Sequence, residues 1–149
     1  MHVYFLKSAT FFLYSKFLWL ETRSQYLSEK LNYIDAASFL NSLPEGSLTY
    51  VVGDQRSYYY NKPVLVTPAF SQNPLALWAN EAASPEDLNQ QLKARGITHL
   101  LVNNSEFKRL DIAYHIFPFT LKGQANWDAL RTREAKRIYR DNHCEVFLL

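Results

Sequence analysis

The segment "RGITHLLVNNSEFKRL", residues 95–110, contains the clearest structural pattern in this chain. Gly96 follows a basic turn, as at the end of a helix, and residues 97–103 are the β-branched and leucine residues typical of a buried strand. Asn103 and Asn104 then precede a charged segment, which is typical of the start of a helix. The segment therefore predicts a helix end, a buried strand and a second helix in direct succession.

An amphipathic helix is expected upstream, in "SQYLSEKLNYIDAASFLNSLPEG", residues 24–46. Its apolar residues recur at spacings of three and four, with Ser24 as the N-cap and Pro44 after the end. A second helix is expected in "SPEDLNQQLKARG", residues 84–96, where the first serine is the N-cap and the final glycine ends the helix. Shorter helical segments are expected within residues 71–83, at the start of residues 104–117 and over residues 127–133.

Further strands are expected on both sides of residues 97–103. "SLTYVVGD", residues 47–54, is a nearly continuous apolar run, and "PVLVTP", residues 63–68, is a second short strand. The closing "AKRIYRDNHCEVFLL", residues 135–149, has the pattern of two strands around residues 141–143, which predicts an antiparallel hairpin.

The order of these elements predicts the fold class. Strands that alternate with helices indicate right-handed crossovers and a parallel sheet covered by helices. We therefore expect an α/β domain over residues 22–149, a small Rossmann-like three-layer sandwich. Its sheet is expected to be mostly parallel, with about five strands and the antiparallel hairpin at one edge.

Composition excludes several classes of function. With 16 Lys and Arg against 14 Asp and Glu, the net charge is +2, too small for the basic surface that follows a nucleic-acid backbone, so nucleic acid is not an expected partner. The single cysteine, Cys144, excludes an internal disulfide and a multi-thiolate metal site, and its apolar surroundings predict a buried thiol. Glycine-rich phosphate loops and catalytic motifs are missing, so no cofactor, metal or catalytic residue is expected.

Residues 1–21 differ from the rest of the chain. The run "VYFLKSATFFLYSKFLWL", residues 3–20, is almost wholly apolar, but Lys7 and Lys16 divide it into pieces shorter than the ~20 residues that span a bilayer. Its lysines and aromatic rings suit a membrane interface. A core helix or a strand pair of the same domain fits the composition equally well. We expect a membrane-interfacial or remnant transmembrane segment.

Candidate binding residues follow two of the predicted strands. Ligands bind beyond the carboxyl ends of parallel strands, and adjacent strands bring these ends together. The candidates are Asp54, Gln55, Arg56, Tyr59, Asn103 and Asn104. Each group also has a structural explanation: an acid–arginine pair can hold a turn, tyrosines can pack over a sheet, and asparagines can cap a helix.

The chain from about Thr22 to Arg109 resembles a known family on the segments quoted above. The helix "SQYLSEKLNYIDAASFLN", the turn "VVGDQRSYYYNKP" and the segment "GITHLLVNNSEFKRL" resemble the C-terminal soluble region of bacterial C-type polytopic membrane glycosyltransferases. Those enzymes are related to the dolichyl-phosphate-mannose protein mannosyltransferases, and the closing "IYRDNHCEVFLL" resembles their terminal hairpin. The residues on the shared turn and strand are Gly53, Asp54, Arg56, Tyr59, Gly96, His99 and Asn103.

The resemblance implies a periplasmic domain attached to a membrane enzyme that uses a lipid-linked sugar. Such enzymes carry their catalytic carboxylate in an early loop between transmembrane helices, so no catalytic residue is carried over to this chain. We therefore expect a non-catalytic, membrane-associated domain or fragment that recognises an acceptor or partner. Its expected partners are the transmembrane part of a parent protein and a lipid-linked sugar or glycan acceptor. The alternative is a free-standing Rossmann-like enzyme that binds a nucleotide or sugar at residues 54–60, although the missing glycine-rich loop weighs against it.

Overall fold

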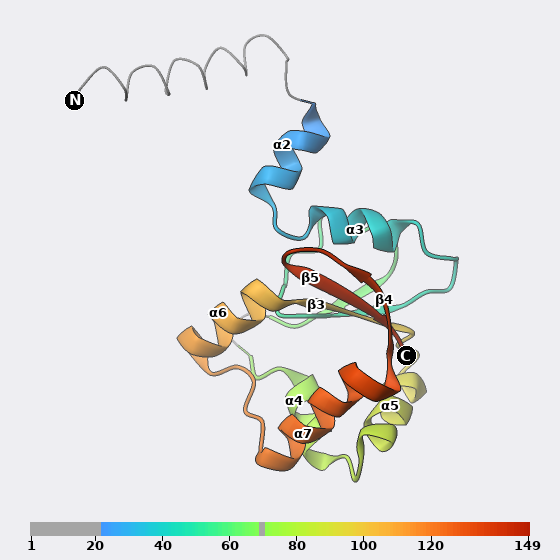
Figure 1. Ribbon diagram of the computed structural model, residues 1–149, viewed down its shortest axis with the longest axis vertical. Coiled ribbons are helices and arrows are strands. Elements are labelled where there is room, and N and C mark those ends of the chain that lie inside the picture. The colour runs from blue at the N-terminus through green and yellow to red at the C-terminus, as the bar shows by residue number, and fades with distance from the viewer. Residues whose placement is uncertain (1–21, 69–70) are drawn as a thin grey trace, which may run out of the picture. The chain divides into compact units, whose positions relative to one another are not determined.

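The computed structural model describes residues 22–68 and 71–149 (Figure 1). Contacts divide the chain into two units, with the boundary between Asn32 and Tyr33, and each unit is described by itself. The interfacial segment expected at residues 3–20 lies outside the described residues. Within the described ranges, none of the helices has the length and apolar character needed to cross a bilayer.

In the first unit, helix α2 (Arg23–Lys30) begins with a reciprocal cap. The Thr22 hydroxyl accepts a hydrogen bond from the Gln25 backbone N–H, and the Gln25 side-chain oxygen accepts one from the Thr22 backbone N–H. The N-cap is therefore Thr22. The expectation of an N-cap at Ser24 is wrong, because Ser24 lies inside the first turn.

The single helix expected within residues 24–46 is interrupted. After α2, Leu31 takes an extended conformation, and a separate helix, α3 (Ile34–Asn41), follows in the second unit. Tyr33, immediately before α3, is buried and packs against two further tyrosine rings. Burial of the Tyr33 ring therefore outweighs the local preference for a continuous helix. Such burial depends on tertiary packing, which the spacing of apolar residues does not reveal.

The described residues of the second unit form a five-stranded sheet in the order β2-β1-β3-β5-β4. Its strands are β1 (Thr49–Val52), β2 (Val64–Val66), β3 (His99–Asn103), β4 (Lys136–Arg140) and β5 (Cys144–Leu148). β1 pairs in parallel with β2 and β3, whereas β5 is antiparallel to β3 and β4. The α/β class and the C-terminal hairpin are confirmed.

The sheet is mixed, so the expectation of a mostly parallel sheet is wrong. Of the four strand pairings among the described residues, two are parallel and two are antiparallel. The reason is that the second strand of the hairpin pairs with β3 and so contributes a full ladder to the sheet. The two strands of a hairpin are antiparallel, because the short turn between them reverses the direction of the chain.

Helices cover both sides of this sheet. They are α3 together with α4 (Pro74–Glu81), α5 (Pro85–Ala94), α6 (Asn104–Tyr114) and α7 (Leu121–Ala129). α3 lies on one side, and α4, α5 and α7 lie on the other (Figure 1). The main apolar core includes the buried Trp127 of α7. α7 begins earlier than the helix expected over residues 127–133 and continues as a π-helical turn, Leu130–Glu134.

Local rules for helix ends account for several of these boundaries. The Ser84 hydroxyl accepts a hydrogen bond from the Asp87 backbone N–H at the start of α5, as expected. Gly96 follows the end of α5 with φ of +79°, the left-handed conformation that the sequence predicts. These two ends fix where the chain turns back toward β3.

Candidate functional site

The carboxyl end of β1 holds the centre of the candidate site. Gly53 takes a φ of +84°, which turns the chain sharply so that Asp54 lies beneath the surface, with 6% of the residue exposed. The Asp54 carboxylate accepts hydrogen bonds from the backbone N–H of Arg56 and from its Nε, both at 2.9 Å. The Arg56 guanidinium also donates through Nη2, so the pair is a fork of charge-assisted hydrogen bonds.

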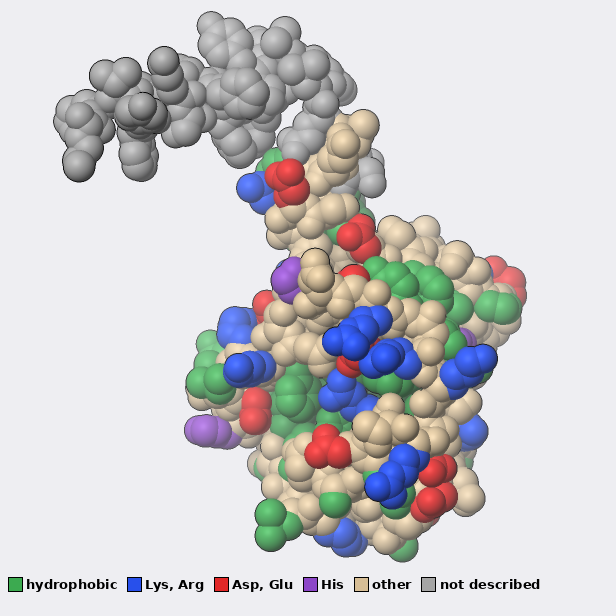
Figure 2. All heavy atoms as spheres, in the orientation of Figure 1, with side chains coloured by type: hydrophobic (Ala, Val, Ile, Leu, Met, Phe, Trp, Pro, Cys, Tyr) green, Lys and Arg blue, Asp and Glu red, His purple; other side chains and the backbone are tan. Residues whose placement is uncertain are grey.

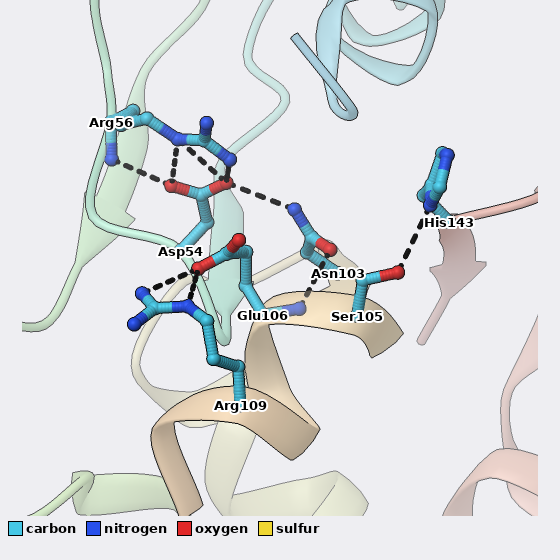
Figure 3. Close-up of polar contacts among 7 residues, drawn as sticks. All are labelled: Asp54, Arg56, Asn103, Ser105, Glu106, Arg109 and His143. Atoms are coloured by element: carbon cyan, nitrogen blue, oxygen red, sulfur yellow. Dashed lines mark hydrogen bonds and ion pairs between the residues drawn. The ribbon is translucent and has the colours of Figure 1, made fainter. Parts of the chain in front are cut away.

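Asn103 joins this pair to the neighbouring strand. Its Nδ2 donates to Asp54 Oδ2 at 3.0 Å, and its Oδ1 accepts from the Glu106 backbone N–H at 3.2 Å (Figure 3). One buried amide therefore caps α6 and orients the carboxylate on β1 at the same time. The expectation that the ends of β1 and β3 lie together is confirmed for Asp54 and Asn103.

A second ion pair lies on the first turns of α6. Arg109 donates from Nε and Nη2 to Glu106 Oε2, at 2.8 and 2.7 Å. Figure 3 shows this pair beside the Asp54–Arg56 pair. A cavity of about 260 Å³ is lined by Gly53, Asp54, Gln55, Arg56, Glu106, Arg109 and Leu110.

The structure brings only part of the predicted set into this cavity. Asp54, Gln55 and Arg56 line it. Asn103 is not part of the lining, but it donates a hydrogen bond to Asp54. Glu106, Arg109 and Leu110 were not predicted. A signal for the two charged residues was present, because they lie three positions apart in the helix that follows β3 and therefore share a face near the same sheet edge.

Tyr59 is placed in an aromatic cluster and is not among the cavity's lining residues. Its ring packs against Tyr33, with the centroids 6.3 Å apart, and meets Tyr58 edge to face at 5.0 Å. The Arg56 guanidinium lies over the Tyr33 ring, 4.4 Å from its centroid, which connects the cluster to the cavity wall. Tyr58 is 83% exposed, so one aromatic face of the cluster is open to solvent.

Asn104 belongs to a different part of the surface. Its Nδ2 donates to Glu145 Oε2 on β5 at 3.4 Å, and its backbone N–H donates to the His143 carbonyl. Neighbouring Ser105 also reaches toward the His143 ring, away from the cavity (Figure 3). The expectation that Asn104 shares a site with Asp54 is therefore not met by the geometry.

The electrostatics of the cavity are those of two neutralised pairs. Hydrogen bonding to Asp54 raises the pKa of Arg56, and hydrogen bonding to Glu106 raises the pKa of Arg109, so both guanidinium groups stay charged. Two carboxylates and two guanidinium groups give the lining a net charge of zero. The lining therefore offers both donors and acceptors without a field that favours ions of one sign.

The other candidate chemical groups lie elsewhere. Cys144 is buried, as expected, and burial raises the pKa of its thiol, so the reactive thiolate is disfavoured. Burial also lowers the pKa of His99. In the part of the chain that the structure describes, no three His, Cys, Asp or Glu side chains are grouped so as to hold a metal ion.

Comparisons of the chain with known protein families, with curated proteins and with solved structures found no match.

Proposed function

We propose that the second unit is a recognition domain of a glycosyltransferase-like membrane protein, and that the cavity beside Asp54 and Arg56 binds a sugar of a glycan acceptor or of a lipid-linked donor. In this proposal the domain does not catalyse sugar transfer itself and lies on the periplasmic side of the membrane. Its mixed sheet with helices on both sides is interpreted as a Rossmann-like sandwich modified by the C-terminal hairpin.

The chemistry of the cavity wall is the observation that carries this proposal. A sugar hydroxyl both donates and accepts hydrogen bonds, so its best partners are paired acceptors and donors in fixed positions. Asp54 and Glu106 supply carboxylate oxygens, and Arg56 and Arg109 supply N–H groups. The neutral sum of these charges favours an uncharged polyol over a phosphate or a metal ion. The volume of about 260 Å³ suits a small ligand of about one sugar ring.

The aromatic cluster gives secondary support. Sugar rings present C–H groups on one face, and these groups pack well on an exposed aromatic ring. Tyr58 offers such a ring two residues after Arg56, and its edge-to-face contact with Tyr59 supports its orientation. With 83% of the residue exposed, the Tyr58 ring is accessible to a ligand from solvent.

A nucleotide-binding enzyme is the less favoured alternative. Phosphates bind at helix N-termini where backbone N–H groups are unpaired and glycines allow close approach. At the start of α6, the Asn104 N–H donates to the His143 carbonyl and the Glu106 N–H donates to Asn103. Gly53 packs against the backbone of this turn, which leaves little room for a phosphate between them.

Titration with a panel of neutral monosaccharides and short oligosaccharides, followed by NMR of labelled protein, tests the proposal. We expect saturable shifts at Gln55 and Arg109, and Arg109→Gln should weaken binding about tenfold, because it removes a charged donor. Arg133→Gln removes the same charge at an exposed position outside the cavity lining and should bind as the wild type does. Absence of saturable binding, or equal binding by Arg109→Gln, would count against the proposal.

A further inference from the structure

A second charged cluster lies on the C-terminal hairpin, separate from the cavity. Of the described residues, three arginines converge on the carboxylate of Glu145 in β5. Arg131 Nη2 donates to Oε2, Arg137 Nη1 donates to Oε1 at 2.9 Å, and Arg140 Nε lies 3.9 Å from Oε1. Figure 2 shows basic side chains gathered around an acidic one over this hairpin. We call these four residues the arginine cluster.

A bulge in β4 makes this convergence possible. In a regular strand, side chains three positions apart point to opposite faces of the sheet, so Arg137 and Arg140 would diverge. The register shifts between Arg137 and Tyr139, so that Arg137 pairs with Phe147 and Arg140 pairs with Glu145. Both arginines therefore lie on the face of β5 that carries Glu145, because a bulge re-aims the side chains that follow it.

The charges of the arginine cluster do not balance. Three guanidinium groups and one carboxylate leave an excess of +2, and among the described residues no other carboxylate is within ion-pair distance of these arginines. Glu145 lies at the base, with its side chain 9% exposed, whereas the side chains of Arg137 and Arg140 are 49% and 65% exposed. The excess positive charge therefore faces solvent.

The cluster is also held in place. The Arg131 guanidinium lies 5.3 Å from the Trp127 ring centroid and 5.6 Å from that of Phe147, and these rings fix its position. Burial acts to raise the pKa of Glu145, but hydrogen bonds and charge from Arg131, with Asn104 and Arg137, lower it overall. The carboxylate thus stays ionised and orients the guanidinium groups before any ligand arrives.

We propose that the arginine cluster, with Asn104 beside it, binds a phosphate group. Planar guanidinium forks match the oxygen pairs of a phosphate, and two forks with solvent-facing N–H groups are available from Arg137 and Arg140. A phosphate ester carries about −1.5 to −2 charges at neutral pH, which matches the excess of +2, whereas a single carboxylate leaves half of it uncompensated. The phosphate belongs either to a small soluble ligand or to a lipid headgroup.

Two binding measurements on the full chain test this proposal and distinguish the two sources. Calorimetric titration with inorganic phosphate and pyrophosphate tests a soluble ligand. Co-sedimentation with phosphatidylcholine vesicles, with and without phosphatidic acid, tests a headgroup. The readout is the increase in binding that phosphatidic acid causes, because the apolar residues 3–20 are expected to bind both kinds of vesicle. We expect Arg137→Gln and Arg140→Gln each to weaken the binding about tenfold, because each removes one charged fork from an exposed position.

Lys136→Gln is the matched control. Lys136 is an exposed cation on the same strand but pairs with Leu148, on the opposite face from Glu145. The substitution removes the same charge and should leave phosphate binding unchanged. Soluble binding that depends on the arginines supports a small ligand, and arginine-dependent binding to phosphatidic acid alone supports a headgroup. Absence of both, or equal weakening by Lys136→Gln, overturns the proposal.

Discussion

Gly53 lies so close to the first turn of α6 that a Cβ at this position would be 2.7 Å from the backbone nitrogen of Phe107. The Asn103 carbonyl oxygen would be 2.8 Å away. Since these neighbours are backbone atoms of α6 and of the last residue of β3, they cannot move aside as a flexible side chain does. The absence of a side chain at Gly53 therefore allows the end of β1 to pack on α6 and brings Asp54 within hydrogen-bond distance of Asn103.

Gly53→Ala should destabilise the domain by about 2–4 kcal/mol, as the sum of a strained positive φ and overpacking against the helix. Urea unfolding measures this free energy. Gly46→Ala is a matched control, because Gly46 has a nearly identical φ of +83° but no atom within 4 Å of an added Cβ. The control should cost only about 1 kcal/mol. Equal costs at both glycines would show that the close approach to α6 contributes nothing.

Asn103→Ala should cost more than the loss of an ordinary helix cap. The substitution removes the cap of α6 and also the hydrogen bond that Asn103 donates to the buried Asp54 carboxylate, so we expect about 2–3 kcal/mol. Ser84→Ala, which removes the hydroxyl cap of α5 without touching an ion pair, should cost about 1 kcal/mol. The comparison uses denaturant unfolding at neutral pH. A smaller cost for Asn103→Ala than for Ser84→Ala would refute the double role of Asn103.

The arginine cluster should make stability depend on pH in the acid range. The pKa of Glu145 is lowered in the folded state from the ordinary value of 4.5. A carboxylate with a depressed folded-state pKa stabilises the fold above its unfolded value, and this stabilisation is lost as the pH falls through the folded value. We therefore expect the free energy of unfolding to fall as the pH drops below 4.5, and to fall less in Glu145→Gln.

The same series needs a control for general acid destabilisation. Glu81→Gln changes an exposed carboxylate that forms no ion pair among the described residues, and it should keep the full acid dependence of the wild type. Urea unfolding of the three proteins between about pH 7 and about pH 3.5 makes the comparison. An unchanged slope in Glu145→Gln would show that this carboxylate does not couple to acid unfolding.

Local patterns in the sequence predict the individual helices and strands of this fold better than they predict how these helices and strands are arranged. Ser84 and Gly96 mark the ends of α5 because caps and left-handed glycines act over a few residues. The break between α2 and α3 follows instead from burial of Tyr33, and the bulge in β4 follows from pairing with β5. Both depend on residues that are distant in sequence, so apolar spacing does not predict them.

In the candidate site, too, the sequence predicts some features and not others. The rule that adjacent parallel strands end at one edge of the sheet correctly brings Asp54 and Asn103 together. That rule does not give side-chain directions. Asn104 follows Asn103 directly but lies one step round the helix, where it meets Glu145. The direction of each side chain at the start of α6 depends on the helix phase, which the sequence does not fix to within one residue.

The apolar N-terminal segment, residues 3–20, should bind to membranes. Residues 3–20 are almost wholly apolar, with two lysines and several aromatic rings, and a soluble protein that exposes such a segment has an apolar patch well above the few hundred Å² found on monomers. We expect the full chain to sediment with liposomes, and a shorter chain starting at Thr22 to remain in the supernatant and unfold cooperatively. Liposome co-sedimentation and urea unfolding of the two proteins measure both outcomes. If both chains stay in the supernatant and the shorter one is unfolded, the segment belongs to the core of the protein and the proposed membrane association is wrong.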